Sequence, residues 1–210
     1  TKGNGAFQEI DQLAMMEPCT KWSERVYDPA RIPELINKAF QQAMSGKPGP
    51  VYLDFPGDVL YRDVDEGSII WPEPWIPSKR AKPQANEADV ASIMAALEKA
   101  ERPVIISGSG IQWGAAETEF QEFVEQAGIP FYTTPQSRGV IAEDHEFCYL
   151  TARSSAFREA DLIMVLGTRM NYVIGHAAPP RFNADATLVR IDIDPTEIDT
   201  SPRVDIGVVA

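Results

Sequence analysis

At its centre the chain reads Pro103-Val104-Ile105-Ile106-Ser107-Gly108-Ser109-Gly110, and these residues are the clearest indication of the fold. The apolar run from Pro103 to Ser107 is typical of a strand that is buried on both faces of a parallel sheet. The glycines that follow predict a tight turn leading into a helix, and glycine there lets the backbone approach a diphosphate. Only Gly-x-Gly is present, without the third glycine of a dinucleotide fingerprint. Nucleotide binding at Gly108, Ser109 and Gly110 and a plain turn are therefore both open.

Strands and helices alternate on both sides of this stretch. Apolar periodicity predicts helices over residues 86–100 and 115–127, and Gly128 closes the second of them. Short apolar runs predict further strands over residues 129–133, 161–167, 187–192 and 204–209. Because strand and helix alternate with short turns, the sequence predicts the α/β class, with a doubly wound parallel sheet in a Rossmann-like domain over residues 84–210.

A proline-rich segment divides the chain. Residues 71–83 hold four prolines and three basic residues. They predict an extended linker without helix or sheet pairing, because proline removes a backbone donor. Residues 1–70 are expected to be a fragment of a second α/β domain. After a polar loop, Asp28 is expected to cap a helix, and residues 51–56 to form a strand.

The composition excludes several classes of protein. Hydrophobic residues make up 44% and charged residues 24% of the 210 residues, which is the balance of a globular chain. The formal net charge of −12 repels polyanions, so nucleic acid is not an expected partner. No apolar stretch approaches the roughly 20 residues needed to span a bilayer, so no membrane partner is expected. Cys19 and Cys148 lie far apart in the sequence, which favours a reducing cytoplasm.

Charged residues at predicted strand ends are the candidate ligands. Arg169 follows the third predicted strand of the second domain, and a guanidinium at the carboxyl end of a parallel strand suits a phosphate. Pairing of Arg169 with a neighbouring carboxylate is the alternative. Asp192 ends the fourth strand, where an acid commonly takes ribose hydroxyls, whereas Asp194 is expected to cap a helix. Arg153 begins a segment that looks like an N-capped helix start, and it faces either a phosphate or the sheet edge.

Motifs of covalent or metal catalysis are missing. The chain has no Gly-x-Ser-x-Gly elbow, no Walker loop and no Cys/His cluster, and no nucleophile can be paired with a base. The two histidines, His145 and His176, are too few for a His-based metal site, and both fall in predicted loops. The residues alone predict an α/β domain of the nucleotide-binding type. No residue in it can be assigned as a catalytic residue or as a metal ligand.

Several segments resemble one family of enzymes. The resemblance is carried by Ala6-Phe7-Gln8-Glu9, Pro18-Cys19-Thr20-Lys21-Trp22, Gly49-Pro50-Val51-Tyr52-Leu53-Asp54-Phe55-Pro56-Gly57-Asp58-Val59 and the segment from Ala100 to Gly110. The first two are similar to the end of the pyrimidine-binding domain of thiamine-diphosphate-dependent enzymes. The family is that of acetolactate synthase, oxalyl-CoA decarboxylase and 2-hydroxyacyl-CoA lyase. The third segment is similar to a characteristic strand of this family, and the fourth to the start of its central domain. The resemblance covers essentially the whole chain. It implies the C-terminal part of a pyrimidine-binding domain in residues 1–70 and a truncated central domain in residues 84–210.

The resemblance implies two kinds of ligand for the central domain. Arg169-Met170-Asn171-Tyr172 is similar to an Arg-Leu-Asn-Trp segment of CoA-handling members, in which the residues that match Arg169 and Asp192 contact an ADP moiety. CoA or ADP is therefore implied at Arg169, Asp192 and Asn171. The surrounding candidates are Gly108, Ser109, Gly110 and Arg153. CoA-handling members often have lysine where this chain has Ser109. Acetolactate synthases instead carry FAD and usually show Phe-Asp near Met170 and Asn171.

The resemblance also implies cofactors and partners outside the chain. The intact enzymes use thiamine diphosphate and magnesium for ylide attack on a carbonyl, with cleavage or ligation of a C–C bond. The family's activating glutamate falls before Thr1 and its magnesium motif after Ala210, so we expect a fragment that is inactive when excised. The expected partners are a small-molecule substrate, the remaining domains of the same enzyme, and further copies in a dimer or tetramer.

Three functions are open at this point. The first is the central part of a lyase or carboligase for 2-hydroxyacyl-CoA or oxalyl-CoA substrates, which anchors the ADP part of CoA. The second is an acetolactate-synthase-like central domain that holds FAD or nothing. The third is a structural domain that bridges catalytic domains and builds the oligomer.

Overall fold

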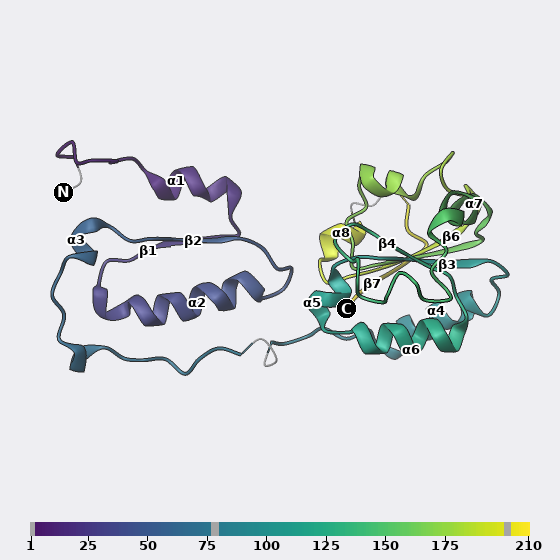
Figure 1. Ribbon diagram of the computed structural model, residues 1–210, viewed down its shortest axis with the longest axis horizontal. Helices are drawn as coiled ribbons and strands as arrows, with labels where there is room; N and C mark the ends of the chain where they lie inside the picture. The colour runs from purple at the N-terminus through teal and green to yellow at the C-terminus, as the bar shows by residue number, and fades with distance from the viewer. Residues whose placement is uncertain (1–2, 77–79, 200–202) are drawn as a thin grey trace. The chain divides into compact units, whose positions relative to one another are not determined.

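The computed structural model describes residues 3–76, 80–199 and 203–210. The chain divides into two compact units, Thr1–Ala81 and Lys82–Ala210, which are described separately (Figure 1). The boundary between them falls within the predicted linker, and residues 71–76 and 80–83 of that segment form neither helix nor strand. Residues 77–79, the rest of the predicted linker, lie outside the described part.

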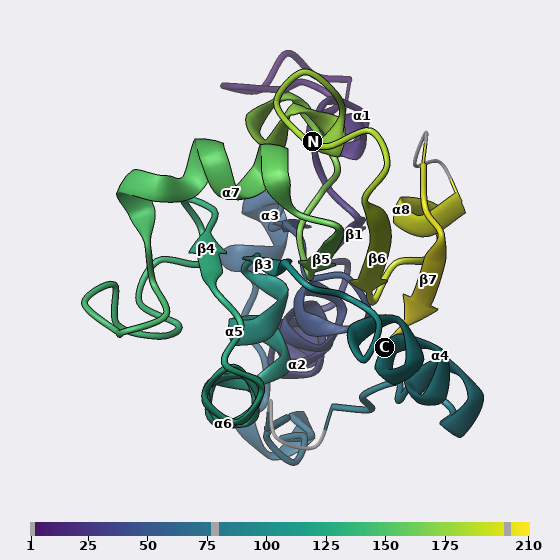
Figure 2. The ribbon, with the colours of Figure 1, turned by 90° about the vertical axis from the view of Figure 1, so that its right-hand side faces the viewer.

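The second unit is built on a five-stranded parallel sheet. Its strands lie in the order β4-β3-β5-β6-β7, which can be followed in Figure 2. The bounds are β3 (Pro103–Ser107), β4 (Phe131–Thr133), β5 (Leu162–Leu166), β6 (Thr187–Asp192) and β7 (Ile206–Val209). Every neighbouring pair is parallel, which confirms the predicted α/β fold, including the strand expected near the end of the chain.

Helices cover both faces of this sheet (Figure 1). On one face, α4 (Glu87–Leu97) and α6 (Glu117–Ala127) bury Ile93, Phe120 and Val124 against the strands. The other face is covered by α7 (Arg153–Glu159) and the 3-10 segment η6 (Tyr172–Ala177). The doubly wound arrangement is thereby confirmed. The remaining helical elements are α5 (Gly110–Gly114), η5 (Leu150–Ala152) and α8 (Pro195–Asp199).

The ends of the two longer helices follow from local sequence. The side chain of Asn86 accepts a hydrogen bond from the amide of Asp89 at 2.9 Å and so caps the start of α4. Gly128 follows α6 with a φ of 63°, a left-handed conformation that glycine adopts without steric cost. Both predicted helices are present, although α4 ends at Leu97, a few residues before its predicted end.

The strand order reverses between β3 and β5. From β3 the chain crosses to β4 on one side, and from β4 it crosses back to β5 on the other side and continues through β6 and β7. The carboxyl ends of β3 and β5 therefore flank a topological switch point. Open α/β sheets bind their ligands in the crevice at such a point.

The first unit is a strand-helix-strand arrangement. Strands β1 (Trp22–Arg25) and β2 (Val51–Asp54) pair in parallel, and α2 (Ile32–Met44) lies between them in the chain. Asp28 caps the helical segment as predicted, because its carboxylate accepts a hydrogen bond from the amide of Ala30 at 3.0 Å. Short helical turns complete the unit: α1 (Gln12–Met16), η1 (Glu17–Cys19), η2 (Pro29–Arg31), α3 (Gly57–Leu60) and η3 (Glu66–Ser68).

The predicted polar loop at the start of the chain is wrong in two places, because α1 and β1 lie there. Strand β1 was missed because Trp22-Ser23-Glu24-Arg25 contains no apolar run. Its pairing partner, β2, lies 29 residues later, so local sequence does not reveal the pairing. Across this pair, Arg25 forms an ion pair with the buried carboxylate of Asp54.

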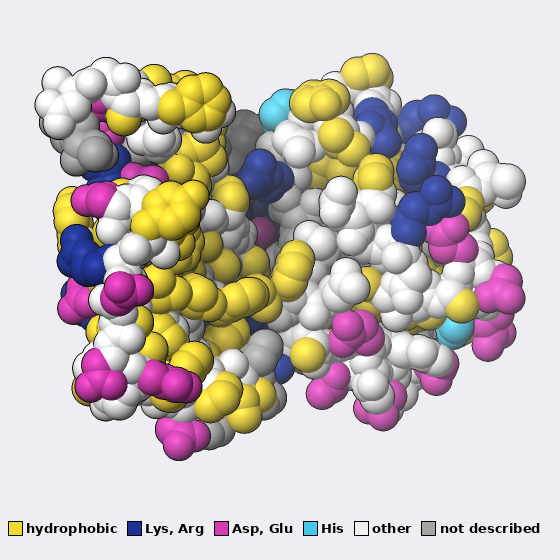
Figure 3. All heavy atoms as spheres, turned by 60° about the vertical axis from the view of Figure 1, so that its left-hand side comes forward, with side chains coloured by type: hydrophobic (Ala, Val, Ile, Leu, Met, Phe, Trp, Pro, Cys, Tyr) yellow, Lys and Arg dark blue, Asp and Glu magenta, His cyan; other side chains and the backbone are white. Residues whose placement is uncertain are grey.

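The core of the first unit is small. Its buried hydrophobic cluster consists of Val26, Leu35 and Val59. Large apolar side chains such as Phe7 and Tyr61 are almost fully exposed, at 92% and 91%. Figure 3 shows hydrophobic side chains spread widely over the visible surface of this unit. Among the described residues of the whole chain, no helix has both the length and the apolar character needed to cross a membrane.

Candidate functional site

The predicted ligand residues gather at the carboxyl edge of the second unit's sheet. The turn 108–110 follows β3, and Arg169 follows β5. The last residues of these strands, Ser107 and Leu166, are neighbours in the sheet. Asp192 ends β6, the next strand along. The fold therefore brings the Gly-Ser-Gly turn and Arg169 together at the switch point, with Asp192 one strand away.

The glycines of this turn make room for the neighbouring turn of the protein. A Cβ on Gly108 would lie 2.2 Å from the carbonyl oxygen of Gly167, and one on Gly110 would lie 2.5 Å from Cα of Gly167. The amide of Gly108 donates to the carbonyl of Leu166 at 2.8 Å, and that of Gly110 donates to Gly167 at 2.9 Å. These two amides are thus used within the protein, and α5 begins at Gly110 inside the predicted turn. The space that these glycines leave, which was expected to admit a ligand, is filled by the backbone of Gly167.

Arg169 is the exposed cation of the switch point. Within the described part of the chain its guanidinium forms no hydrogen bond or ion pair. The alternative of a carboxylate partner for Arg169 is therefore not what the described residues show. A guanidinium placed in this way can donate two parallel hydrogen bonds to phosphate oxygens.

Asp192 lies beside a buried arginine that sequence reasoning missed. Its Oδ1 accepts a hydrogen bond from the amide of Asp194 at 3.0 Å, and its Oδ2 lies 4.0 Å from Nη2 of Arg190. Arg190 is buried, and it pairs with Oε2 of Glu197 at 2.7 Å. The only sequence signal was an arginine inside an apolar strand, two residues before an acid. Asp194 caps α8, as predicted, by accepting the amide of Thr196 at 3.0 Å.

Asn171 precedes η6 and caps its first turn. Its side-chain oxygen accepts a hydrogen bond from the amide of Val173 at 3.0 Å, so this oxygen is used in a contact within the protein. Farther along η6, the backbones of His176 and Ala177 have left-handed φ values of 52° and 48°. Non-glycine residues are held in this region only where surrounding contacts enforce it. One such contact joins Nδ1 of His176 to the carbonyl of Met170 at 3.1 Å.

Arg153 begins α7 and is exposed, without a hydrogen bond or ion pair to any described residue. The predicted N-cap at this helix start is wrong, because the residue before it, Ala152, has no side-chain acceptor. Helix α7 instead continues directly from η5. No described contact joins Arg153 to the residues of the switch point.

The loop after β4 is pinned to the end of β3 by buried hydroxyl groups. The hydroxyl of Ser137 lies 2.5 Å from the carbonyl oxygen of Ser107 and 3.3 Å from the hydroxyl of Thr134. All three residues are buried. The next residue, Arg138, makes two hydrogen bonds to Glu143 at 2.8 and 2.9 Å, and this partner lowers the pKa of the Glu143 carboxyl. These contacts hold the loop after β4 against the end of β3.

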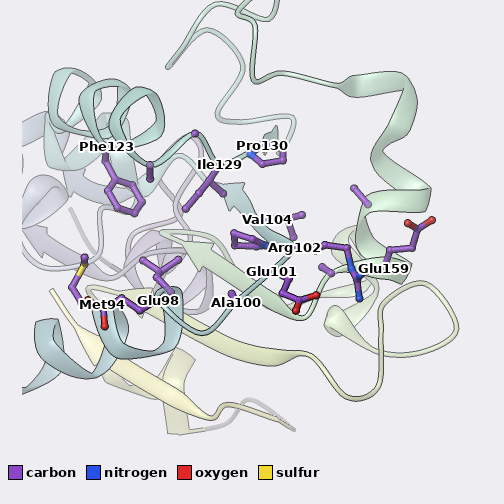
Figure 4. A pocket seen from close by; sticks show the side chains of 16 residues that line it. Met94, Glu98, Ala100, Glu101, Arg102, Val104, Phe123, Ile129, Pro130 and Glu159 are labelled. Carbon is purple, nitrogen blue, oxygen red and sulfur yellow. The ribbon is translucent and has the colours of Figure 1, made fainter.

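A separate hollow of about 680 Å³ lies at the opposite edge of the sheet, beside Pro103 and Pro130 at the amino ends of β3 and β4 (Figure 4). Its lining contains none of the predicted ligand residues. It is largely apolar, and Glu98, Glu101 and Glu159 outnumber Arg102 among its charged residues. Such a lining disfavours a diphosphate, so this hollow does not fit the nucleotide ligand that the sequence suggests.

Known proteins resemble the chain over nearly its whole length. Residues 90–210 match the family described as "Thiamine pyrophosphate enzyme, central domain". The chain is 33% identical over 200 residues to a "2-hydroxyacyl-CoA lyase" of Arabidopsis thaliana, which covers 94% of the chain and 35% of that protein. It is 32% identical over 209 residues to the "Oxalyl-CoA decarboxylase" of Escherichia coli (strain K12), covering 98% of the chain and 36% of that protein. A "Probable acetolactate synthase large subunit" of Methanocaldococcus jannaschii is 33% identical over 216 residues, covering 99% of the chain and 36% of that protein.

The chain spans about a third of the length of these relatives. The match to the central domain falls on the second unit, whose parallel sheet carries the switch point. The chain therefore belongs to the thiamine pyrophosphate enzyme family, and its residues 90–210 are the central domain.

Proposed function

We propose that the second unit anchors the ADP part of CoA in a thiamine-diphosphate-dependent lyase or carboligase that acts on 2-hydroxyacyl-CoA or oxalyl-CoA substrates. Two kinds of relative, the lyases and the decarboxylase, are named for CoA thioesters. This supports a CoA ligand for the present chain, although each name describes only the protein that carries it. The remaining domains of the enzyme and a homo-oligomer of two or four copies belong to the same proposal.

The proposal is carried by the exposed guanidinium of Arg169 at the switch point. The chain has a formal net charge of −12, so an anionic ligand needs a local cation that is not already neutralised. Arg169 meets this requirement among the described residues, whereas Arg138 is paired with Glu143. In this arrangement Arg169 binds the diphosphate and Asp192, one strand away, accepts a ribose hydroxyl. The glycine turn shapes the floor of the site but does not donate the Gly108 and Gly110 amides.

The thiamine chemistry itself is not assigned to this chain. In the described ranges, no three His, Cys, Asp or Glu side chains are grouped so that they could hold a metal ion. These residues do not fit a magnesium site, and none of them is given a catalytic step. What the chain contributes under this proposal is the binding and orientation of a nucleotide-bearing substrate.

Calorimetric titration of the full chain with CoA, ADP and FAD tests the proposal. CoA and FAD both contain an ADP moiety, so comparison of the two distinguishes the ligands, while ADP tests the shared contacts. We expect CoA and ADP to bind and FAD not to bind. Binding of FAD without CoA would replace the proposal with an acetolactate-synthase-like domain. Binding of none of the three would leave a bridging domain without a ligand.

A further inference from the structure

A buried guanidinium links the elements that carry Arg169 and Asp192. Arg190 lies in β6, and only 1% of its side chain is exposed. We propose that Arg190 is a positioning residue of the nucleotide site, which sets the separation between the guanidinium of Arg169 and the carboxylate of Asp192. This inference rests on the proposed function. It adds a residue that does not contact the ligand itself but acts through Arg169 and Asp192.

The guanidinium of Arg190 contacts both elements at once. Its Nη2 donates a hydrogen bond to the carbonyl oxygen of Thr168 at 3.2 Å, and this carbonyl belongs to the peptide that leads into Arg169. The same Nη2 lies 4.0 Å from Oδ2 of Asp192. A displacement of Arg190 would therefore release the peptide that orients Arg169 and change the charge that faces Asp192.

Glu197 of α8 holds this guanidinium in place. Its Oε2 accepts a hydrogen bond from Nη2 at 2.7 Å, and its carbonyl oxygen accepts one from Nη1. Helix α8 packs closely on β7, since a Cβ added at Gly207 would come within 2.4 Å of Cγ2 of Ile198. Glu197 is therefore held on a helix that packs directly against the neighbouring strand. A planar fork of donors can reach the carbonyl and the carboxylates together, whereas lysine would keep the charge but present one nitrogen.

A merely structural role for Arg190 makes a different prediction. Loss of a buried ion pair lowers the stability of the folded unit, but the molecules that still fold would keep the same selectivity for the ribose. A positioning role instead changes how well diphosphate and ribose are bound together. The ratio of the affinities for ADP and 2′-deoxy-ADP isolates the ribose contact, because the two ligands share the base and the diphosphate.

The test is calorimetric titration of the full chain and its variants with these two ligands. In the wild type, a hydroxyl contact to Asp192 should favour ADP by about 10- to 150-fold, the range for a hydrogen bond to a charged group. In Arg190→Lys the ratio should fall about five-fold or more, toward one. Glu197→Gln should also lower this affinity ratio. Without the carboxylate of Glu197, the guanidinium of Arg190 should move toward Asp192 and pair with it. Arg102→Lys is the matched control. Arg102 also donates to a carbonyl, that of Glu159 at 2.8 Å, but at the opposite edge of the sheet.

Melting curves identify the variants that fold, and if Arg190→Lys does not fold, the ratio in Glu197→Gln decides the outcome. A wild-type ratio in the folded variants would overturn the positioning role and leave the proposed function standing. An equal fall in Arg102→Lys would also overturn it, since the effect would then not depend on the site. Failure of the wild type to bind ADP would refute the proposed function, and the positioning role with it.

Discussion

Replacement of Gly110 by alanine tests the contact between the turns that follow β3 and β5. A Cβ at this position would lie 2.5 Å from Cα of Gly167 and 2.9 Å from its carbonyl oxygen. Both atoms belong to the backbone, so no side-chain rotation relieves the overlap, and one of the turns has to move. Gly110 is also the first residue of α5, where helix preference alone would favour alanine.

The expected magnitude follows from these two opposing effects. An extra carbon forced into a packed contact costs about 1–3 kcal/mol. The preference of a helix for alanine over glycine offsets up to about 1 kcal/mol of this cost. We therefore expect Gly110→Ala to lower the free energy of unfolding of the second unit by about 1–2 kcal/mol. For a unit of this size, the melting temperature should fall by roughly 4–8 °C.

Urea titration of the full chain, followed by far-ultraviolet circular dichroism, measures this change. Gly114→Ala is the matched control in the same helix, because a Cβ there would meet Cβ of Ala116 at 3.9 Å, an ordinary contact. The control should be neutral or slightly more stable than the wild type. Wild-type stability of Gly110→Ala, or an equal loss in both variants, would show that the contact with Gly167 does not exclude a side chain at Gly110.

Three further predictions concern a ligand contact, a half-buried carboxylate and the linker. Arg169→Ala should weaken CoA binding about 10- to 150-fold through loss of a charge-assisted contact, while the same change at exposed Arg158 should not. Calorimetry decides this, and equal dissociation constants for wild type and Arg169→Ala would contradict it. Burial raises the pKa of Asp161, but hydrogen bonds from the amides of Glu101 and Arg102 prevail and lower it. Stability is therefore full above the unfolded value of about 3.9 and is lost as pH falls through the folded pKa, and acid titration of Asp161→Asn should show a smaller loss. Brief trypsin digestion should cut first between residues 78 and 82, after Arg80, whereas a dominant early cut inside the second unit would contradict the linker.

Much of the second unit could be predicted from sequence because its signals are local. The apolar runs of β3 and β5 and the glycine after α6 each mark an element within a few residues. The helix expected after the glycine turn was placed at residues 115–127, and the separate α5 was not distinguished because Gly110–Gly114 is too short for periodicity to appear. Strand β1 was missed because its residues are mostly polar and its pairing partner, β2, lies far away in the sequence. The association of residues 1–70 with a pyrimidine-binding domain stays a prediction.

The candidate site was predictable in position but not in detail. Strand ends in a parallel sheet predict where ligand residues gather, and Arg169 and Asp192 do lie there. Local sequence could not show that Gly108 meets Gly167, because that contact depends on which strands become neighbours. The partners of Arg190 were hidden in the same way, since Thr168 lies 22 residues away in the chain. The ligand roles of Asn171 and Arg153 stay predictions.

The hydrophobic clusters of the two units are built from separate parts of the sequence. Among the described residues, the clusters of the second unit draw on side chains from Ala85 onward, whereas that of the first unit ends at Val59. A genetic crossover between Ala81 and Lys82 would therefore leave each of these clusters with all of its own members. Recombination there would transfer the five-stranded sheet of the second unit in one piece, together with Arg169 and Asp192 at its carboxyl edge. This position is therefore where central domains from different family members can be joined to the first unit without dividing a sheet or a hydrophobic cluster.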